Sequence, residues 1–202
     1  MKGPYLFPGW RRAESYRFFV LAGVAALLVL SVAFTQLLAS AAGVREETLR
    51  LHILANSDSP RDQWIKLQVR DSILEQVGQF LATAQNREEA VELVQLSLPR
   101  IQAAADKALA RTGSGQRAEI SLEEYRFSTT RYEGFTLPAG EYLALRITLG
   151  KGQGHNWFCC LYPALCLDAS GAEYAAPEKN ELVFGDYLVR FAAIELWEEL
   201  WN

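Results

Sequence analysis

Apolar residues form one long run near the N-terminus, and elsewhere they recur at the spacings of strands and helices. Residues 18–44 include no charged residue, and a helix needs about 20 apolar residues to cross a bilayer. Basic residues that flank such a span stay on its cytoplasmic side. The pattern therefore predicts a cytoplasmic basic segment at 1–17, a signal peptide or transmembrane anchor at 18–42, and an extracytoplasmic domain at 45–202. The basic segment holds Lys2, Arg11, Arg12 and Arg17 against one acid, Glu14.

The end of the apolar run combines a feature of a cleaved signal peptide with a feature of a retained anchor. The small residues "ASA" at 39–41 match a cleavage site, whereas the run is longer than the apolar core of most signal peptides. Both outcomes place the domain outside the cytoplasmic membrane. The membrane is a partner of the mature chain only if the helix is retained.

The stretch "ETLRLHILANSD" alternates in the manner of a half-buried strand. Leu49, Leu51 and Ile53 form its apolar row. His52 is predicted to share the opposite face with Arg50, away from that row.

A helix is predicted to follow this strand, with Ser59 as its N-cap and Pro60 in its first turn. On one face Asp62, Lys66 and Arg70 recur, and the spacing of Asp62 and Lys66 predicts an ion pair. Apolar residues at intervals of three or four form the buried stripe of this helix. They are Ile65, Val69, Ile73, Val77 and Phe80 or Leu81.

A second helical region is predicted over 85–112, with Asn86 and Glu89 as a capping pair. Pro99 is expected to kink or split it, because proline lacks a backbone donor and clashes with the preceding turn.

Strands are predicted at 118–127, 141–150 and 155–162, a loop at 168–180 and an amphipathic helix at 186–202. A slip in the alternation near Glu123 and Glu124 predicts a bulge in the first of these strands. The resulting order, β-α-α-β-β-β-α, predicts a single α+β domain with a mainly antiparallel sheet packed on helices.

Charge excludes one class of partner. The whole chain carries −4 and residues 1–41 carry +3, so the remainder carries −7. An acidic domain lacks the basic surface that nucleic acids require, so we expect no nucleic-acid partner.

The segment "GHNWFCCLYPALC" holds all three cysteines and one of the two histidines. In a strand His155 and Cys159 would lie roughly 13 Å apart, too far for a catalytic dyad, so that a dyad would need His52. Cys159 and Cys160 point to opposite faces and cannot easily bind one zinc ion. We therefore predict no catalytic group, no metal site, no cofactor and no small-molecule substrate.

Export would place these cysteines in an oxidising setting, where a disulfide can form. Pro163 favours a turn between Cys159 and Cys166 that could bring the two together. A bond between Cys160 and Cys166 competes with that pairing, as does a state with three buried thiols.

Two stretches, "LRLHILANSDSPRDQWIKLQVRD" at 49–71 and "LPAGEYLALRITLGKGQGHNWFCCLYPALCL" at 137–167, resemble the stage II sporulation protein R family of endospore-forming bacteria. The resemblance covers nearly all of 45–202. It implies a signalling protein that is made in the forespore and exported into the space between the two septal membranes. There it would activate a membrane-embedded aspartic protease of the mother cell, which removes the pro-segment of a sigma factor.

The resemblance also implies candidate residues for partner contact or fold specification. Cys160 stands where the family has an aliphatic residue, which implies the pair Cys159–Cys166. An exported Cys/His thiol hydrolase and a structural domain of the septal envelope are the alternatives. An exposed apolar patch would mark the partner surface, and Trp157 or the helix with Trp197 and Trp201 could supply it. The positions that match the family are His52, Asn56, Ser57, Asp58, Asp62, Lys66, Arg70, Asp71, Gly154, His155, Asn156, Trp157, Cys159, Pro163 and Cys166.

Overall fold

The computed structural model describes residues 9–132, 135–164, 177–184 and 188–201. It divides into two compact units, one up to Ser40 and one from Ala41 onward. The first unit consists of the greater part of helix α1 (Gly9–Glu46). The segment Tyr16–Glu46 of this helix is long and apolar enough to cross a membrane, as expected for a signal or anchor helix.

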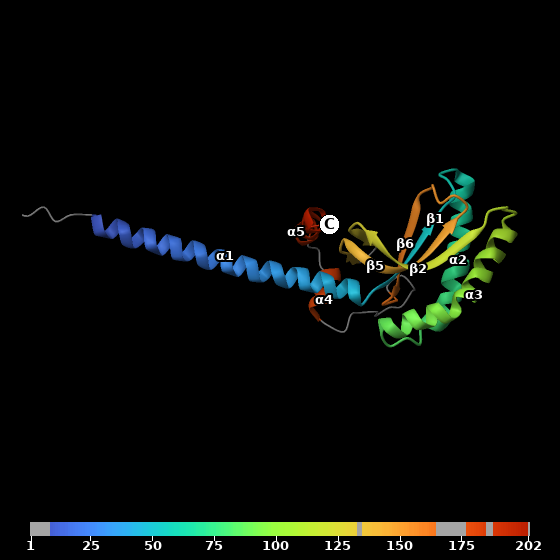
Figure 1. The fold of residues 1–202 in the computed structure, drawn as a ribbon, viewed down its shortest axis with the longest axis horizontal. Coiled ribbons are helices and arrows are strands. Elements are labelled where there is room, and N and C mark those ends of the chain that lie inside the picture. Colours follow the sequence, from blue (N-terminus) through green and yellow to red (C-terminus); the bar gives the residue numbers. More distant parts are fainter. Residues whose placement is uncertain (1–8, 133–134, 165–176, 185–187, 202) are drawn as a thin grey trace, which may run out of the picture. The chain divides into compact units, whose positions relative to one another are not determined.

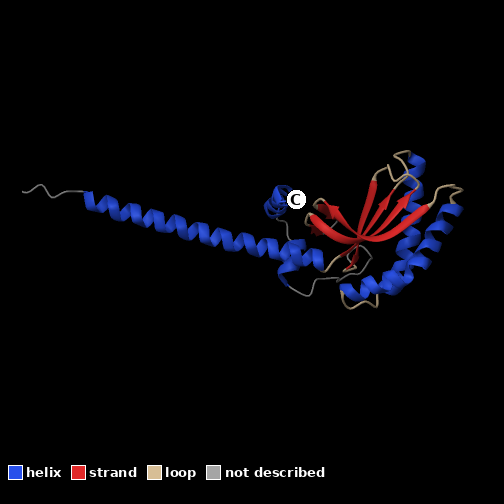
Figure 2. Cartoon of the chain, in the orientation of Figure 1, coloured by secondary structure: helices blue, strands red, loops and turns tan. Residues whose placement is uncertain are grey.

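The second unit is built on a four-stranded sheet in the order β2-β5-β1-β6 (Figure 2). β1 runs parallel to β5, while β2 and β5 are antiparallel to each other, as are β1 and β6. The predicted α+β class and mainly antiparallel sheet are confirmed. A short hairpin of β3 and β4 was not predicted. The strands are β1 (Leu49–Leu54), β2 (Ala118–Phe127), β3 (Thr130–Tyr132), β4 (Phe135–Leu137), β5 (Gly140–Leu149) and β6 (Asn156–Tyr162).

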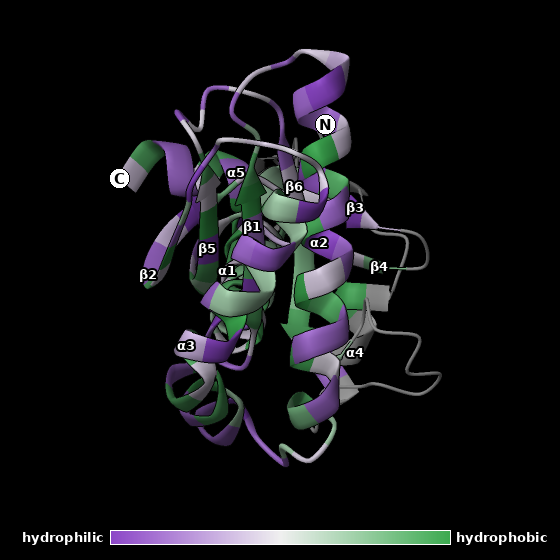
Figure 3. Cartoon of the chain, turned by 90° about the vertical axis from the view of Figure 1, so that its right-hand side faces the viewer, coloured by the Kyte–Doolittle hydropathy of each residue, from purple (hydrophilic) through white to green (hydrophobic). Residues whose placement is uncertain are grey.

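Helices α2 (Pro60–Leu81) and α3 (Arg87–Arg111) cover one face of the sheet (Figure 1). The predicted cap is confirmed, since the Ser59 side chain accepts a hydrogen bond from the backbone of Asp62. The apolar stripe of α2 is buried against the strands, which are the hydrophobic layer behind the helices in Figure 3. Pro99 does not split α3, which continues on both sides of it.

The other face of the sheet is also covered, which corrects the prediction for β1. All six residues of β1 are buried, including Arg50 and His52. β1 is paired on both edges, and the burial of its alternating side chains shows that both of its faces meet packed side chains. Its second layer includes the aromatic side chains of Tyr125, Phe127, Tyr142 and Phe158.

Two further predictions are wrong in detail. β2 pairs with β5 in an unbroken register, so the expected bulge at Glu123 and Glu124 is not there. The irregularity lies instead between β1 and β6, at Leu49 and Arg50. The predicted loop at 168–180 ends early, because α4 (Pro177–Phe184) begins inside it. The predicted C-terminal helix is confirmed as α5 (Leu188–Trp201).

Candidate functional site

Three loops meet at one end of the sheet. β1 and β5 are parallel, so the loops that follow them emerge side by side, next to the loop that precedes β2. Asn56 joins two of these loops: its side-chain oxygen accepts from the backbone of Lys151 at 2.9 Å, and its carbonyl accepts from Gln153 at 3.3 Å. The backbone of Gly154 donates to Ala55 at 2.9 Å. We call residues 55–59, 112–117 and 150–156 the loop cluster.

Asp62, in the first turn of α2, organises the loop cluster from behind. One carboxylate oxygen accepts from Asn56 at 2.8 Å and from the hydroxyl of Ser57. The other accepts from the side chain of Gln116 at 2.6 Å. The hydrogen bonds from Ser57 and Asn56 hold the pKa of Asp62 below its usual range, so the carboxylate is ionised at neutral pH. No pattern in the sequence marks Gln116, which contacts Asp62 only through the tertiary fold.

The predicted ion pair between Asp62 and Lys66 is wrong. The ammonium of Lys66 donates to the side chain of Gln63 at 2.7 Å and to the carbonyl of His155 at 2.9 Å. Lys66 is buried. Its hydrogen bond to the carbonyl of His155 connects α2 to the start of β6. Burial lowers the pKa of Lys66. The helical spacing of Asp62 and Lys66 permits an ion pair. In the fold, however, Asp62 binds Gln116 and Lys66 binds the carbonyl of His155.

Asp58 and His155 form the exposed part of the loop cluster. One oxygen of Asp58 accepts from the backbone of His155 at 2.6 Å and lies 2.5 Å from its Nδ1. These hydrogen bonds hold the pKa of Asp58 below its usual range. Because Nδ1 faces the carboxylate, the other ring nitrogen is directed away from Asp58. The site therefore presents an oriented imidazole to solvent.

Arg70 and Asp71 lie farther along α2, beside β6. The guanidinium of Arg70 stacks 5.3 Å from the ring of Trp157 and pairs with Asp71 at 2.6 Å. Asn156 is exposed at the start of β6. The structure thus brings nine of the ten predicted contact residues to α2 and the start of β6, although the side chain of Asn156 lies on the face of the sheet that holds His52. They are Asn56, Asp58, Asp62, Lys66, Arg70, Asp71, His155, Asn156 and Trp157.

His52 is the exception, since it lies inside the aromatic layer on the opposite face of the sheet. Its ring is 4.5 Å from that of Tyr125 and 4.9 Å from that of Phe158. Burial lowers the pKa of His52 from 6.5 to about 4, so the ring is neutral at physiological pH. Its surroundings are those of a residue that specifies the fold.

The cysteines that the structure describes are buried. Cys159 belongs to the core beneath α2 and α3, and Cys160 is also fully buried. A reactive thiol needs access to solvent and a lowered pKa, so this burial does not favour the thiol-hydrolase alternative. Cys166 lies outside the described residues, and its pairing with Cys159 stays a prediction.

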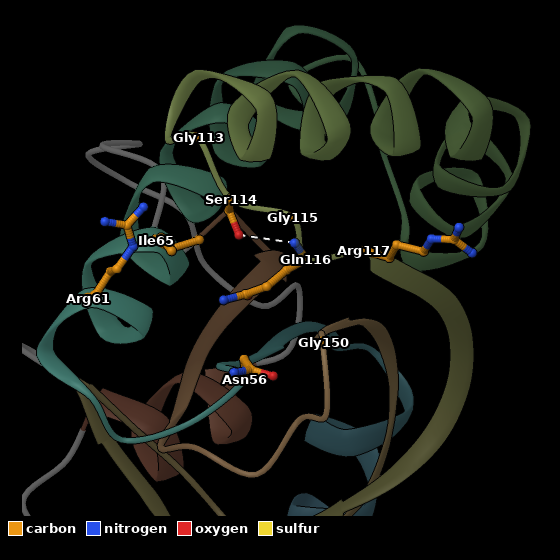
Figure 4. Close-up of a pocket in the computed structure, with 9 residues that line it drawn as sticks. All are labelled: Asn56, Arg61, Ile65, Gly113, Ser114, Gly115, Gln116, Arg117 and Gly150. Carbon is orange, nitrogen blue, oxygen red and sulfur yellow. Dashed lines mark hydrogen bonds between the residues drawn. The ribbon is translucent and has the colours of Figure 1, made fainter.

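An open depression of about 590 Å³ lies beside the loop cluster. Figure 4 shows the side chain of Gln116 near Asn56, whereas Arg117 points away from the other residues of the lining. Among the described residues no group of three His, Cys, Asp or Glu side chains could hold a metal ion. The remaining residues of the lining are Arg61, Ile65, Gly113, Ser114, Gly115 and Gly150.

The model of one protein family, stage II sporulation protein R, matches residues 45–171, which include the whole loop cluster. The chain belongs to the stage II sporulation protein R family. A family member from Bacillus subtilis (strain 168), itself named stage II sporulation protein R, is 36% identical over 139 residues. That match covers 68% of this chain and 62% of the relative, so it spans less than two thirds of the relative's length. No solved structure matches the chain.

The name of the stage II sporulation protein R family links the chain to sporulation. The family match, residues 45–171, includes the whole of both stretches that carry the resemblance in the sequence. In the fold these stretches form β1, α2, β5 and β6, which meet at the loop cluster.

Proposed function

We propose that the domain acts outside the cytoplasmic membrane, between forespore and mother cell, as a protein signal. It activates a membrane-embedded aspartic protease in trans, and the protease then removes the pro-segment of a mother-cell sigma factor. Family membership and the N-terminal apolar helix both support this proposal. The domain is secreted if the helix is cleaved and anchored with its N-terminus inside if it is retained.

The observation that carries the proposal is the construction of the loop cluster. Two buried side chains fix the exposed residues His155 and Asp58 in place. Lys66 binds the carbonyl of His155, and Asp62 binds Ser57 in the segment that carries Asp58. A surface that is already ordered loses less conformational entropy on binding than a mobile one. The loop cluster is therefore suited to recognise a protein partner.

The exposed residues are the proposed contacts. Asp58, His155 and Asn156 supply hydrogen-bonding groups. Trp64, which sequence reasoning missed, lies one turn into α2 and is 50% exposed. Exposed tryptophans are common hot spots of protein interfaces. The buried stripe predicted for this helix leaves Trp64 out, so the sequence held the signal that could have found it.

The proposal is tested by co-expression of the full chain, the protease and its pro-sigma substrate in a non-sporulating host. Cleavage of the substrate, followed by immunoblot, is expected only when all three proteins are present. His155→Ala and Trp64→Ala should lower cleavage without abolishing it, because each removes one contact. Leu96→Ala, at a position on α3 that is 73% exposed, is the matched control and should leave cleavage unchanged.

Absence of cleavage with the wild-type chain would contradict direct activation of the protease. Equal cleavage by the His155→Ala, Trp64→Ala and Leu96→Ala variants would contradict the assignment of the contact surface alone.

A further inference from the structure

Helix α5 presents an apolar stripe to solvent at the end of the chain. Leu196 is 58% exposed, Leu200 and Trp201 are each 69% exposed, and Trp197 is 36% exposed. The rings of Trp197 and Trp201 lie 5.2 Å apart. These four side chains, which we call the tryptophan stripe, recur at the spacing of one helix face. Phe191 and Ile194, one to two turns earlier in α5, are buried.

The position of α5 in the domain is fixed by polar contacts near the end of α1. Glu198 lies 3.5 Å from Arg45, and the backbone carbonyl of Glu198 accepts from Arg126 at 2.8 Å. Arg45 is the first charged residue after the uncharged stretch 18–44. A charged residue at this point of a membrane helix lies at the level of the lipid headgroups. α5 is therefore attached to the residue that marks the membrane surface.

The segment that connects α1 to β1 is short. α1 ends at Glu46 and β1 begins at Leu49. Arg45, which contacts Glu198, lies four residues before β1 in the sequence.

The chemistry of the tryptophan stripe fits an interfacial position. Tryptophan is enriched at the boundary between headgroups and acyl chains, and an amphipathic helix can bury its apolar face there. Two of the acids of α5 are already engaged: Glu195 accepts from the backbone of Thr129 at 3.2 Å, and Glu198 pairs with Arg45. Of these two acids only Glu198 has a basic partner that offsets its charge, and Glu199 of the same helix is exposed.

We propose that the tryptophan stripe of α5 inserts into the interfacial layer of the membrane, on the side where the domain emerges. This inference rests on the export of the domain proposed above, with the N-terminal helix retained. β1 leads from this end of the domain to the loop cluster, and six residues of strand span about 20 Å. Docking of α5 on lipid would thus hold the loop cluster away from the membrane surface, where a partner can reach it.

Tryptophan fluorescence of the full chain in proteoliposomes tests the inference. The vesicles contain phosphatidylethanolamine and phosphatidylglycerol, with or without bromine in the upper half of the acyl chains. The double variant Trp197→Phe/Trp201→Phe keeps the other three of the five tryptophans. The emission of Trp197 and Trp201 is obtained by subtracting the emission of this variant from that of the wild type, and we call the result the difference emission. Brominated lipid is expected to remove about half of this difference emission.

A charged residue in the tryptophan stripe should weaken the insertion. Leu200→Glu is expected to lower the quenching of the difference emission several-fold. Leu96→Glu, which places the same charge at an exposed leucine of α3, should leave the quenching unchanged. Because all of these positions are exposed, circular dichroism is expected to show the same fold for each variant.

Difference emission that brominated lipid does not quench would overturn the inference. The inference would also be overturned if the two tryptophans were shielded from aqueous acrylamide only when the protease is present. That result would show that a protein, and not lipid, covers the tryptophan stripe. The quenching is measured without the protease, so intact cleavage in the co-expression assay would leave the proposed function standing even if the stripe does not insert.

Discussion

The guanidinium carbon of Arg50 lies 3.7 Å from the centroid of the Phe127 ring, on the face of the sheet away from α2 and α3. The same guanidinium donates to the hydroxyl of Tyr132 at 2.8 Å and to that of Thr130 at 3.2 Å. Arg50 is fully buried. An aromatic ring and two hydroxyl groups thus stabilise this cation in the interior, and they account for the burial of β1 on its second face.

Arg50→Ala should therefore destabilise the domain strongly. The variant loses a desolvated cation–π contact of about 2 kcal/mol and hydrogen bonds from a charged donor, which contribute about 1.5 kcal/mol or more. We expect the free energy of unfolding to fall by about 3 kcal/mol, measured by denaturant unfolding of the full chain in detergent micelles. Arg126→Ala is the control, because Arg126 is exposed and its pair with Glu198 contributes less than about 1 kcal/mol. Equal losses in the two variants would contradict the role given to Arg50.

His52 should make the stability of the domain depend on pH. Burial lowers its pKa from 6.5 to about 4, so between these values the unfolded chain binds a proton that the folded chain does not. The free energy of unfolding is therefore expected to fall as the pH is lowered from 6.5 to about 4, and this contribution ends below about 4. His52→Phe should weaken the dependence in urea unfolding curves recorded across this range.

The second histidine of the chain provides the control for this pH dependence. His155 is exposed, so His155→Ala should retain the wild-type slope between pH 6.5 and 4. Comparison of His52→Phe with the wild type cancels the carboxylates, because both chains keep all of them and the contact between His155 and Asp58. A slope that His155→Ala removes and His52→Phe retains would contradict the assignment.

Gly154 should tolerate no side chain. A Cβ atom there would lie 2.2 Å from the backbone oxygen of Ser57, so one loop of the loop cluster would have to move. We expect Gly154→Ala to lower the free energy of unfolding by about 2 kcal/mol and to lower pro-sigma cleavage. Gly115→Ala is the control in the same cluster, since its Cβ would meet no atom within 4 Å. A tolerated Gly154→Ala variant would show that the two loops are not in close contact.

Asp62→Ala should disconnect the loop cluster from α2. It removes the acceptor of three side-chain hydrogen bonds, from Asn56, Ser57 and Gln116. We expect a loss of about 2 kcal/mol at neutral pH, measured by thermal unfolding. Glu92→Ala, which removes an exposed acid of α3, should change stability little.

The pH dependence of the Asp62→Ala effect follows from the lowered pKa of Asp62. The stabilisation by the carboxylate is complete above the pKa of the unfolded chain and disappears as the pH falls through the lower pKa of the folded chain. The difference between wild type and Asp62→Ala should therefore shrink only in acid. A difference that is lost already near neutral pH would contradict an ionised, hydrogen-bonded Asp62.

Local signals predicted much of the fold because they act over a few residues. The cap at Ser59, the buried stripe of α2 and the strand at 141–150 each follow from local signals along the chain, and the structure confirms them. The Asp62–Lys66 pair failed for the opposite reason. Its spacing was suitable, but Gln116 and the carbonyl of His155 come from distant parts of the chain.

The sequence by itself determined the apolar N-terminal helix, the α+β class and the two segments that carry the family resemblance, because length, periodicity and motif are properties of neighbouring residues. Only the tertiary structure decided that β1 is central and doubly covered, that His52 is buried on the face of the sheet away from α2, and how far Trp64 and the tryptophan stripe are exposed. Burial depends on which elements pack together. That packing is a sum of contacts between residues far apart in the chain, which no local pattern records.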